Sequence, residues 1–202
     1  MSYQLIHEGY VPLSEEDLKS SYNWLSGIDY YSYGGNTSCL EIHDEDNIII
    51  IDAGTGIRPL GNEILSHPQT KHLHLLISHT HWDHIQGFPF FVPAFIKGYN
   101  INLYASPNLD KDLESIFKGQ LDRAYFPVQM EDMQADLNFI HFGEDPIQIG
   151  DMEVSWEYTV HPSATVGYKI KMPGRTVAFV PDNEFAKGYL GRPHDITMDH
   201  EL

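Results

Sequence analysis

Cysteine is almost absent from this chain of 202 residues, since Cys39 is the only one. A single thiol cannot form a disulfide within the chain, so the sequence gives no sign of an oxidising compartment. Cys39 lies in an apolar stretch, Ser38 to Ile42, where a free cysteine usually packs as a small hydrophobic residue. We therefore expect a buried thiol and not a nucleophile.

Basic residues are scarce as well, with 12 Lys and Arg against 29 Asp and Glu, which gives a net charge of −17. The lysines and arginines are scattered along the chain and form no basic patch. A negative field repels long nucleic acids unless such a patch offsets it. The composition therefore favours a small-molecule substrate over a long nucleic acid, although most of the acidity is explained by solubility alone.

Long apolar runs are missing too. No stretch is long enough to span a bilayer, and the N-terminus shows no basic segment followed by an apolar core, as a signal peptide would. We therefore expect a cytoplasmic protein without a membrane partner. The length and the 42% of hydrophobic residues fit one domain with a sizeable core.

What the chain does contain is histidine, 12 in all, and the densest cluster is His79-Thr80-His81-Trp82-Asp83-His84. The cluster follows an apolar run, Leu73 to Ile77, that predicts a buried strand. It precedes Ile85-Gln86-Gly87, which predicts one turn of helix. Imidazole and carboxylate groups are ordinary ligands of zinc and similar divalent metals. The pattern therefore predicts a metal-binding loop between a strand and a helix.

The spacing within the loop favours two metal ions over one. In an extended loop His79, His81 and Asp83 alternate, so their side chains point to one side, while His84 points elsewhere. We expect His79 and His81 to bind the first ion, and Asp83 and His84 the second. The alternative is a histidine-rich surface loop without metal, but a chance H-x-H-x-D-H directly after an apolar strand is much rarer than a chance histidine pair.

The motif resembles the signature of the metallo-β-lactamase superfamily, in which H-x-H-x-D-H follows a strand. Three further segments resemble the branch that contains ribonuclease Z and the bacterial cyclic-phosphate phosphodiesterases: Tyr33-Gly34-Gly35-Asn36-Thr37-Ser38-Cys39, Ile51-Asp52-Ala53-Gly54-Thr55-Gly56 and Phe179-Val180-Pro181-Asp182-Asn183. Matching segments run from about Gly34 to about Asp195. The resemblance implies an α+β fold, the αβ/βα sandwich of two packed sheets with helices outside.

Hydrophobic periodicity and turn residues predict the elements of such a sandwich. The predicted strands are Tyr3–Val11, Ser38–His43, Ile48–Asp52, Leu73–Ile77, Ile101–Ala105, Leu137–Phe142, Ile147–Ile149, Met152–Val160, Thr165–Met172 and Arg175–Val180. The predicted helices are Ser14–Leu25, Ile57–Leu65, Leu109–Phe117 and Glu184–Leu190. The run Ile48 to Ile51 is continuously apolar, so we expect its strand to be covered on both faces. The aromatic, proline-rich segment Phe88–Phe95 is expected mostly in the core.

Further metal ligands are implied by the resemblance. His161, at the end of a predicted strand, matches the third histidine that binds the first metal. Asp182 matches the aspartate that bridges both metals. Asp52 matches an aspartate that supports the metal loop without binding metal, and helix capping is an equally simple interpretation of it.

The family also carries one more histidine near the end of its domain. His194 and His200 follow Asp182 in the chain, but neither follows a strand in the required way. We therefore expect residues 1–202 to form a single domain that ends before the last strand and helix. The last ligand of the second metal and the catalytic competence of this chain then stay open.

The chemistry expected from this site is hydrolysis by a hydroxide that bridges two divalent metal ions. Metal binding lowers the pKa of water from 15.7 to about 7 and stabilises charge on the attacked group. Asp83 is the candidate catalytic residue, because it could orient the water or take its proton. Relatives that reduce oxygen or nitric oxide often carry a carboxylate at position 81, so His81 favours hydrolysis. Zinc is the expected metal, with manganese or iron as alternatives.

The expected substrate is a small phosphodiester such as a cyclic nucleotide or a nucleotide diester. A thioester, lactone or β-lactam hydrolase on the same site is one alternative, and a non-catalytic metal-binding signalling module is another. Ser163, Thr165 and Tyr168 follow His161 and could contact a phosphate or simply belong to a sheet. By analogy with relatives, the protein could form a homodimer.

Overall fold

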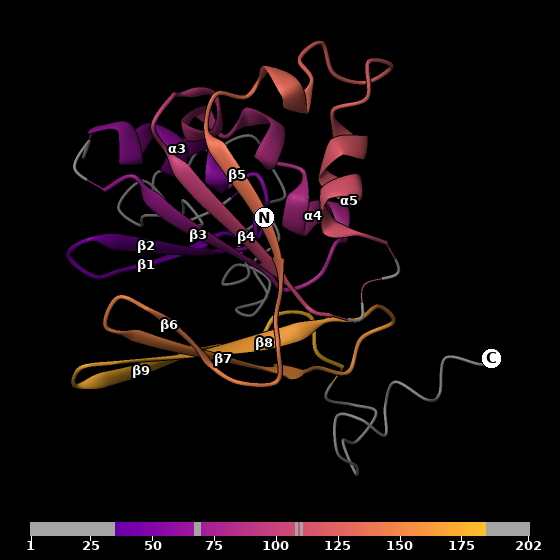
Figure 1. Ribbon diagram of the computed structural model, residues 1–202. Coiled ribbons are helices and arrows are strands. Elements are labelled where there is room, and N and C mark those ends of the chain that lie inside the picture. Colours follow the sequence, from indigo (N-terminus) through magenta and orange to yellow (C-terminus); the bar gives the residue numbers. More distant parts are fainter. Residues whose placement is uncertain (1–34, 67–69, 108, 110, 185–202) are drawn as a thin grey trace, which may run out of the picture. The chain divides into compact units, whose positions relative to one another are not determined.

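The computed structural model describes residues 35–66, 70–107, 109 and 111–184. Nine strands in these residues form two sheets, which lie one above the other in Figure 1. The first sheet has the order β1-β2-β3-β4-β5, with β1 antiparallel to β2 and all other neighbours parallel. Its strands are β1 (Leu40–His43), β2 (Asn47–Ile51), β3 (His72–Ile77), β4 (Asn100–Ala105) and β5 (Asp136–His141).

The second sheet is antiparallel throughout, with the order β6-β7-β8-β9. Its strands are β6 (Ile147–Ile149), β7 (Met152–Tyr158), β8 (Val166–Met172) and β9 (Arg175–Phe179). Gly174, with φ of 78°, makes the tight turn between β8 and β9, where a residue with a side chain would be strained. The turn lies between the strands predicted at Thr165–Met172 and Arg175–Val180.

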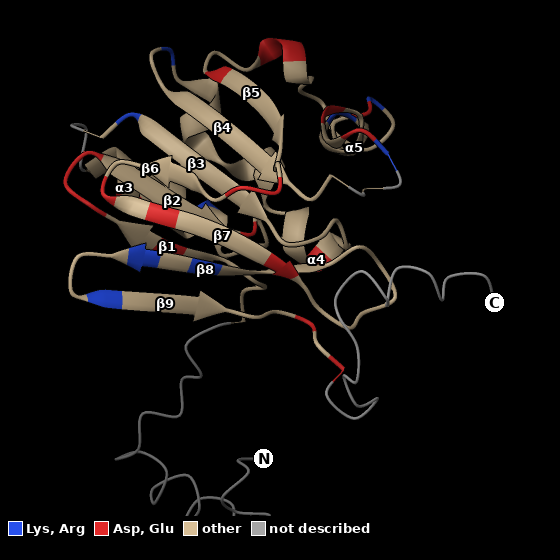
Figure 2. Ribbon diagram, turned by 60° about the horizontal axis from the view of Figure 1, so that its bottom comes forward, with Lys and Arg blue, Asp and Glu red and all other residues tan. Residues whose placement is uncertain are grey.

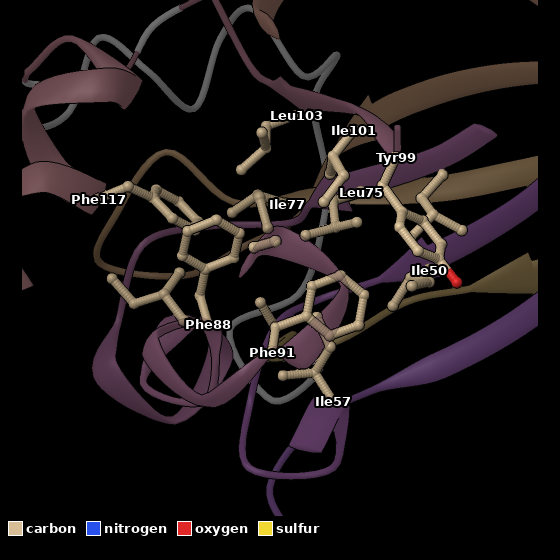
Figure 3. Packing of buried hydrophobic residues seen from close by; sticks show 14 of the residues in the cluster. Ile50, Ile57, Leu75, Ile77, Phe88, Phe91, Tyr99, Ile101, Leu103 and Phe117 are labelled. Carbon is tan, nitrogen blue, oxygen red and sulfur yellow. The ribbon is translucent and has the colours of Figure 1, made fainter. Parts of the chain in front are cut away.

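The described helices pack on the outer face of the first sheet (Figure 1). They are α3 (Ile57–Ser66), α4 (Trp82–Ile85), α5 (Leu113–Gln120) and the 3₁₀ turns η1 (Phe88–Phe90), η2 (Val92–Phe95) and η3 (Met130–Asp132). Figure 3 shows Phe88, Phe91 and Phe117 filling the space between these helices and the strand residues Leu75 and Ile77. The aromatic, proline-rich segment is thus largely core, as expected, although Phe90 is exposed.

A second apolar cluster lies between the two sheets, and strand β2 serves both clusters. Ile48 and Ile50 belong to the helix-side core, whereas Ile49 and Ile51 pack toward the second sheet. Successive residues of a strand point to opposite faces, and each face of β2 is covered by one of these clusters. Ile49, Ile50 and Ile51 are therefore completely buried. The prediction that this strand is covered on both faces is confirmed.

Two contacts join the second sheet to the end of β3, directly before the histidine-rich loop. The buried Tyr168 hydroxyl donates a hydrogen bond of 2.7 Å to the carbonyl oxygen of Ile77. The amide of Val166 donates to the carbonyl oxygen of Ser78 at 3.0 Å. Burial raises the pKa of Tyr168 well above its usual value, and the charge of Asp52 adds to this shift. The phenol therefore stays a donor, and it anchors the loop to β8.

Some sequence predictions need correction. The helix predicted at Leu109–Phe117 is α5, Leu113–Gln120, because Asp112 caps it by accepting a hydrogen bond from the Ser115 amide at 3.0 Å. The helical turn predicted at Ile85–Gly87 begins earlier, as α4. Most other boundaries agree within two residues. The strand Tyr3–Val11 and the helix Ser14–Leu25 lie outside the described residues, as does the helix Glu184–Leu190 apart from its first residue.

Cys39 is half-buried against the helix-side core and forms no disulfide. Burial raises the pKa of its thiol to about 12, and the charges of Asp52 and Glu41 contribute. The thiolate is therefore disfavoured, in agreement with the expected packing role. Within the described residues, no helix combines the length and the apolar character that a membrane span requires.

Tyr168→Phe removes the hydroxyl that joins the sheets and leaves the Ile77 carbonyl buried without this donor. We expect a loss of about 1–3 kcal/mol in the free energy of unfolding. Urea denaturation measures this difference. Tyr125→Phe is the matched control, because Tyr125 is 81% exposed, and its stability should change by no more than about 0.5 kcal/mol. Equal stability of the two variants would contradict the anchoring role.

The half-buried His74 imidazole on β3 should make the metal-free protein less stable in acid. Burial lowers its pKa to about 4, and the charge of His72 adds to the effect. Between pH 6.5 and 4 the unfolded chain therefore takes up a proton that the folded chain does not, so the free energy of unfolding falls as pH falls. His74→Gln should flatten this part of the profile in urea denaturation. An unchanged slope in His74→Gln would contradict this cause.

Candidate metal centre

All predicted site residues lie at or just beyond the carboxyl ends of strands. Asp52 follows β2, and the loop His79–His84 follows β3 in the first sheet. His161 and Asp182 follow β7 and β9 in the second sheet. The packing of the two sheets brings these four strand ends to one corner of the molecule.

Backbone hydrogen bonds fix the histidine-rich loop against the segment after β2. The Ala53 amide donates to the His84 carbonyl oxygen at 2.7 Å, and the Gly87 amide donates to the Ala53 carbonyl oxygen at 2.8 Å. A Cβ at Gly87 would lie 2.0 Å from the Gly54 carbonyl oxygen, and one at Gly54 would lie 2.4 Å from the Asp83 carbonyl oxygen. Both glycines are therefore required by the close approach of two backbones.

The Asp52 carboxylate is completely buried and holds three groups at once. Its Oδ1 accepts a hydrogen bond from the Ser78 amide at 2.8 Å, and its Oδ2 accepts one from the Ser38 hydroxyl at 2.9 Å. The Oδ2 also lies 2.7 Å from Nδ1 of His84. Because a carboxylate only accepts, His84 donates from Nδ1 and presents Nε2 to the site. Asp52 thus contacts the candidate ligand His84 and does not cap helix α3.

The two loops of the second sheet are tied to each other. The Thr159 hydroxyl donates to the Asp182 carbonyl oxygen at 3.3 Å, and the Val160 amide donates to the Asn183 side chain at 3.1 Å. These bonds place His161 beside Asp182. Asp52 and Asp182, with φ of 63° and 25°, are the two non-glycine residues with positive φ in the described ranges. Aspartate tolerates this region better than most residues, and such conformations concentrate at functional sites.

The first group of candidate ligands comprises His79, His81, His161 and Asp182. Nδ1 of His81 lies 3.0 Å from Nε2 of His79 and 3.1 Å from Nε2 of His161. Nitrogen ligands about 2.0–2.1 Å from a tetrahedral zinc stand roughly 3.3 Å apart, so this cluster fits one zinc ion. The Asp182 Oδ2 completes the group, 3.6 Å from His79 Nε2 and 3.8 Å from His161 Nε2.

The second group comprises Asp83, His84 and Asp182. Nε2 of His84 lies 3.3 Å from Oδ2 of Asp83 and 3.4 Å from Oδ2 of Asp182. Three ligands that leave further positions open fit a second divalent ion. Asp182 is therefore the residue that both groups share. His194 and His200, which the sequence analysis did not assign as ligands, lie outside the described residues.

The electrostatics of the cluster shift the pKa values of His79 and His84 in opposite directions. Burial lowers the pKa of His79 to about 3, and the neighbouring imidazoles of His84, His81 and His161 add to the shift, whereas Asp182 opposes it. Burial also acts to lower the pKa of His84, but its hydrogen bond to Asp52 and the nearby carboxylates raise it overall. His79 is therefore neutral near pH 7 and free to donate a lone pair.

One detail of the sequence-based prediction is wrong. The loop is extended only as far as His81, since Asp83 lies in the first turn of α4, so strand-like alternation does not orient it. The helical turn instead brings Asp83 and His84 together. Of the two interpretations left open for Tyr168, the structure supports the sheet residue, because Tyr168 lies buried in β8 and its hydroxyl bonds Ile77, and Thr165 is buried directly before that strand.

Sequence reasoning missed the residues that hold the ligands in place. Ser78 and Ser38 bind the Asp52 carboxylate, and Asn183 ties the two loops of the second sheet together. Ser38 and Asn183 lie inside the segments that carry the family resemblance. Their position in those segments could have indicated a functional role. Their hydrogen-bond partners could not be predicted, because those partners are distant in the sequence.

A cavity of about 690 Å³ lies beside these loops, but none of the residues that line it is a candidate ligand. It is formed by residues of β7, β8 and β9 and of the segments that follow β7 and β9. We place the chemistry at the His/Asp cluster because that cluster supplies convergent donor atoms, whereas size alone makes no site reactive.

The sequence matches the family model described as a beta-lactamase superfamily domain over residues 47–199, most of the chain. The chain belongs to this superfamily. Its fold family consists mostly of hydrolytic metalloenzymes that bind divalent metals. The sequence matches none of the curated proteins with which it was compared.

Two solved structures show the same superfamily fold. The metallo-beta-lactamase fold protein YhfI from Bacillus subtilis has a TM-score of 0.53 at 17% identity, and the match covers 74% of this chain and 57% of that one. The short form of human tRNase Z, ELAC1, has a TM-score of 0.52 at 14% identity, with 76% and 65% covered. The chain thus spans less than two thirds of either neighbour.

Asp52→Asn should weaken metal binding although Asp52 is not in either ligand group. An amide presents one acceptor oxygen, so one or more of the Ser78, Ser38 and His84 contacts is lost. We expect metal affinity to fall about 10–100-fold, as for other groups that orient a metal-binding histidine. Competition with a chromogenic chelator measures this affinity. Asp46→Asn, at an exposed position between β1 and β2, is the control, and a matching loss there would contradict the proposed role of Asp52.

Proposed function

We propose that this protein is a dinuclear, metal-dependent hydrolase of small phosphodiesters. The observation that carries the proposal is the position of Asp182, whose Oδ2 lies within 3.8 Å of Nε2 of His79, His84 and His161. A carboxylate has two oxygens and can contact two cations. One residue that belongs to both ligand groups is what a pair of adjacent metal ions requires.

Each of the two groups of side chains would hold one metal ion. His79, His81, His161 and Asp182 would hold one divalent ion, and Asp83, His84 and Asp182 the other. Bound ions of this kind lower the pKa of coordinated water and stabilise negative charge on the group under attack. Imidazole and carboxylate donors suit zinc, with manganese or iron as alternatives.

The protein's own groups would orient the reaction and handle the proton. The Asp83 side chain is 56% exposed at the mouth of the cluster, where it could orient the attacking water and accept its proton. His79 and His84 are 1% and 3% exposed, so they form the rigid floor of the site. Asp52 holds His84 in one tautomer and one orientation.

The choice of a phosphodiester rests on sequence segments and charge. The Gly-Gly-Asn-Thr-Ser and Pro-Asp-Asn-Glu elements resemble the phosphodiesterase branch more than the lactamase or thioesterase branches. One structural neighbour is named a tRNase, which supports phosphodiester chemistry for the fold. The net charge of −17 favours a small diester over a long nucleic acid.

Elemental analysis and hydrolysis of bis-p-nitrophenyl phosphate test this proposal together. About two metal ions per chain with turnover is the expected result. His81→Ala should reduce the bound metal to about one ion and lower turnover at least about 100-fold, because it removes the central ligand of the first group. His43→Ala, which replaces an exposed histidine outside the cluster, should keep both values.

Other results would redirect the assignment. Two bound metals with hydrolysis of thioesters, lactones or β-lactams but not of the diester would replace the substrate class. Metal without turnover of any of these substrates would favour a metal-binding module. Unchanged turnover in His81→Ala would contradict the catalytic scheme itself.

A further inference from the structure

We infer that Trp82 is a stacking surface for an aromatic group of the substrate, so that the preferred diester carries a nucleobase or an aryl ester. This inference rests on the proposed function, because it assigns the non-reacting part of the same substrate. It concerns a residue inside the H-x-H-x-D-H loop that is neither a ligand nor part of the core.

The exposure of Trp82 is unusual for its size and position. The side chain is 71% exposed at the first residue of α4, between His81 of the first ligand group and Asp83 of the second. Within the described residues, its indole makes no hydrogen bond and no ring contact. A large apolar ring left in water is costly unless something covers it, and the two chain neighbours of this one are a candidate ligand of each group.

The other exposed aromatic side chains do not share these features. Phe90 is 52% exposed, but its ring packs edge-on against Phe126 at 5.4 Å between centroids. Tyr125 is more exposed, at 81%, but it belongs to the segment after α5 and not to a metal-binding loop. Among the described residues, Trp82 is thus the exposed aromatic side chain that the ligand loop itself carries.

The scarcity of basic residues near the candidate ligands also favours an uncharged contact with the substrate. No lysine or arginine occurs in residues 72–96, 151–168 or 176–184, the three segments that carry all the candidate ligands. Figure 2 shows the basic residues of the second sheet on β8 and β9. Apart from the metals, these segments offer an anionic substrate no cation. Within these segments, affinity for the rest of the substrate comes from uncharged contacts, and stacking of a flat ring on an aromatic side chain contributes about 1–3 kcal/mol.

Two substrates with the same scissile bond isolate the contribution of base stacking to KM. Thymidine 5′-(p-nitrophenyl) phosphate and methyl p-nitrophenyl phosphate release the same chromophore, but only the first carries a base. In the zinc-loaded protein, Trp82→Ala should raise KM for the thymidine ester roughly tenfold more than KM for the methyl ester, as expected for loss of one base stack. Trp82→Phe, which keeps a ring, should recover most of the difference, and Tyr125→Ala should change neither KM.

A binding measurement separates this inference from the proposed function. Thymidine 5′-monophosphate should quench the tryptophan fluorescence of the zinc-loaded protein saturably, and Trp82→Phe should remove the quenching while Trp24 and Trp156 stay in place. This result would support the inference even if neither ester were hydrolysed. An equal loss for both esters in Trp82→Ala, or no saturable quenching in the unmutated protein, would overturn it.

Discussion

The buried Asp52 carboxylate connects the segments that carry the candidate ligands of the first sheet. Asp52 follows β2 with a left-handed backbone and accepts hydrogen bonds from the Ser78 amide after β3 and from the Ser38 hydroxyl before β1. Its third contact is with His84 on α4. A buried charge is tolerated only when its hydrogen-bonding capacity is met, so these partners must keep their places together. The position of one candidate ligand is thereby set by the ends of three strands.

The second sheet contributes its part of the site through two loops and not through its strands. Tyr168 and Val166 attach β8 to the end of β3, and the bonds between the loops at 159–161 and 182–184 hold His161 against Asp182. The candidate centre therefore spans both sheets. Stability and metal affinity should be linked here, since ligands that converge only in the folded chain add their binding free energy to folding.

The site combines crowded imidazoles with a deficit of cations. Four imidazole rings meet within ring-centroid distances of 4.1 to 5.0 Å, and burial with mutual repulsion keeps the proton off His79. With no lysine or arginine in the surrounding segments, the natural counter-charge for Asp83 and Asp182 is a metal ion. The exposed Trp82 indole, between His81 and Asp83 in the chain, is an uncharged surface on the same loop.

The sequence by itself determined the strands, the layered fold and the histidine-rich loop, because these depend on local patterns. The four isoleucines of β2 could be interpreted without a structure, since alternation along a strand follows from backbone geometry alone. The family resemblance also pointed to His161, Asp182 and Asp52. Only the tertiary structure decided how these residues meet: the tautomer of His84, the helical setting of Asp83 and the shared position of Asp182. Each of these depends on contacts between segments that lie far apart in the chain, and no local pattern encodes the distance between strand ends in two different sheets.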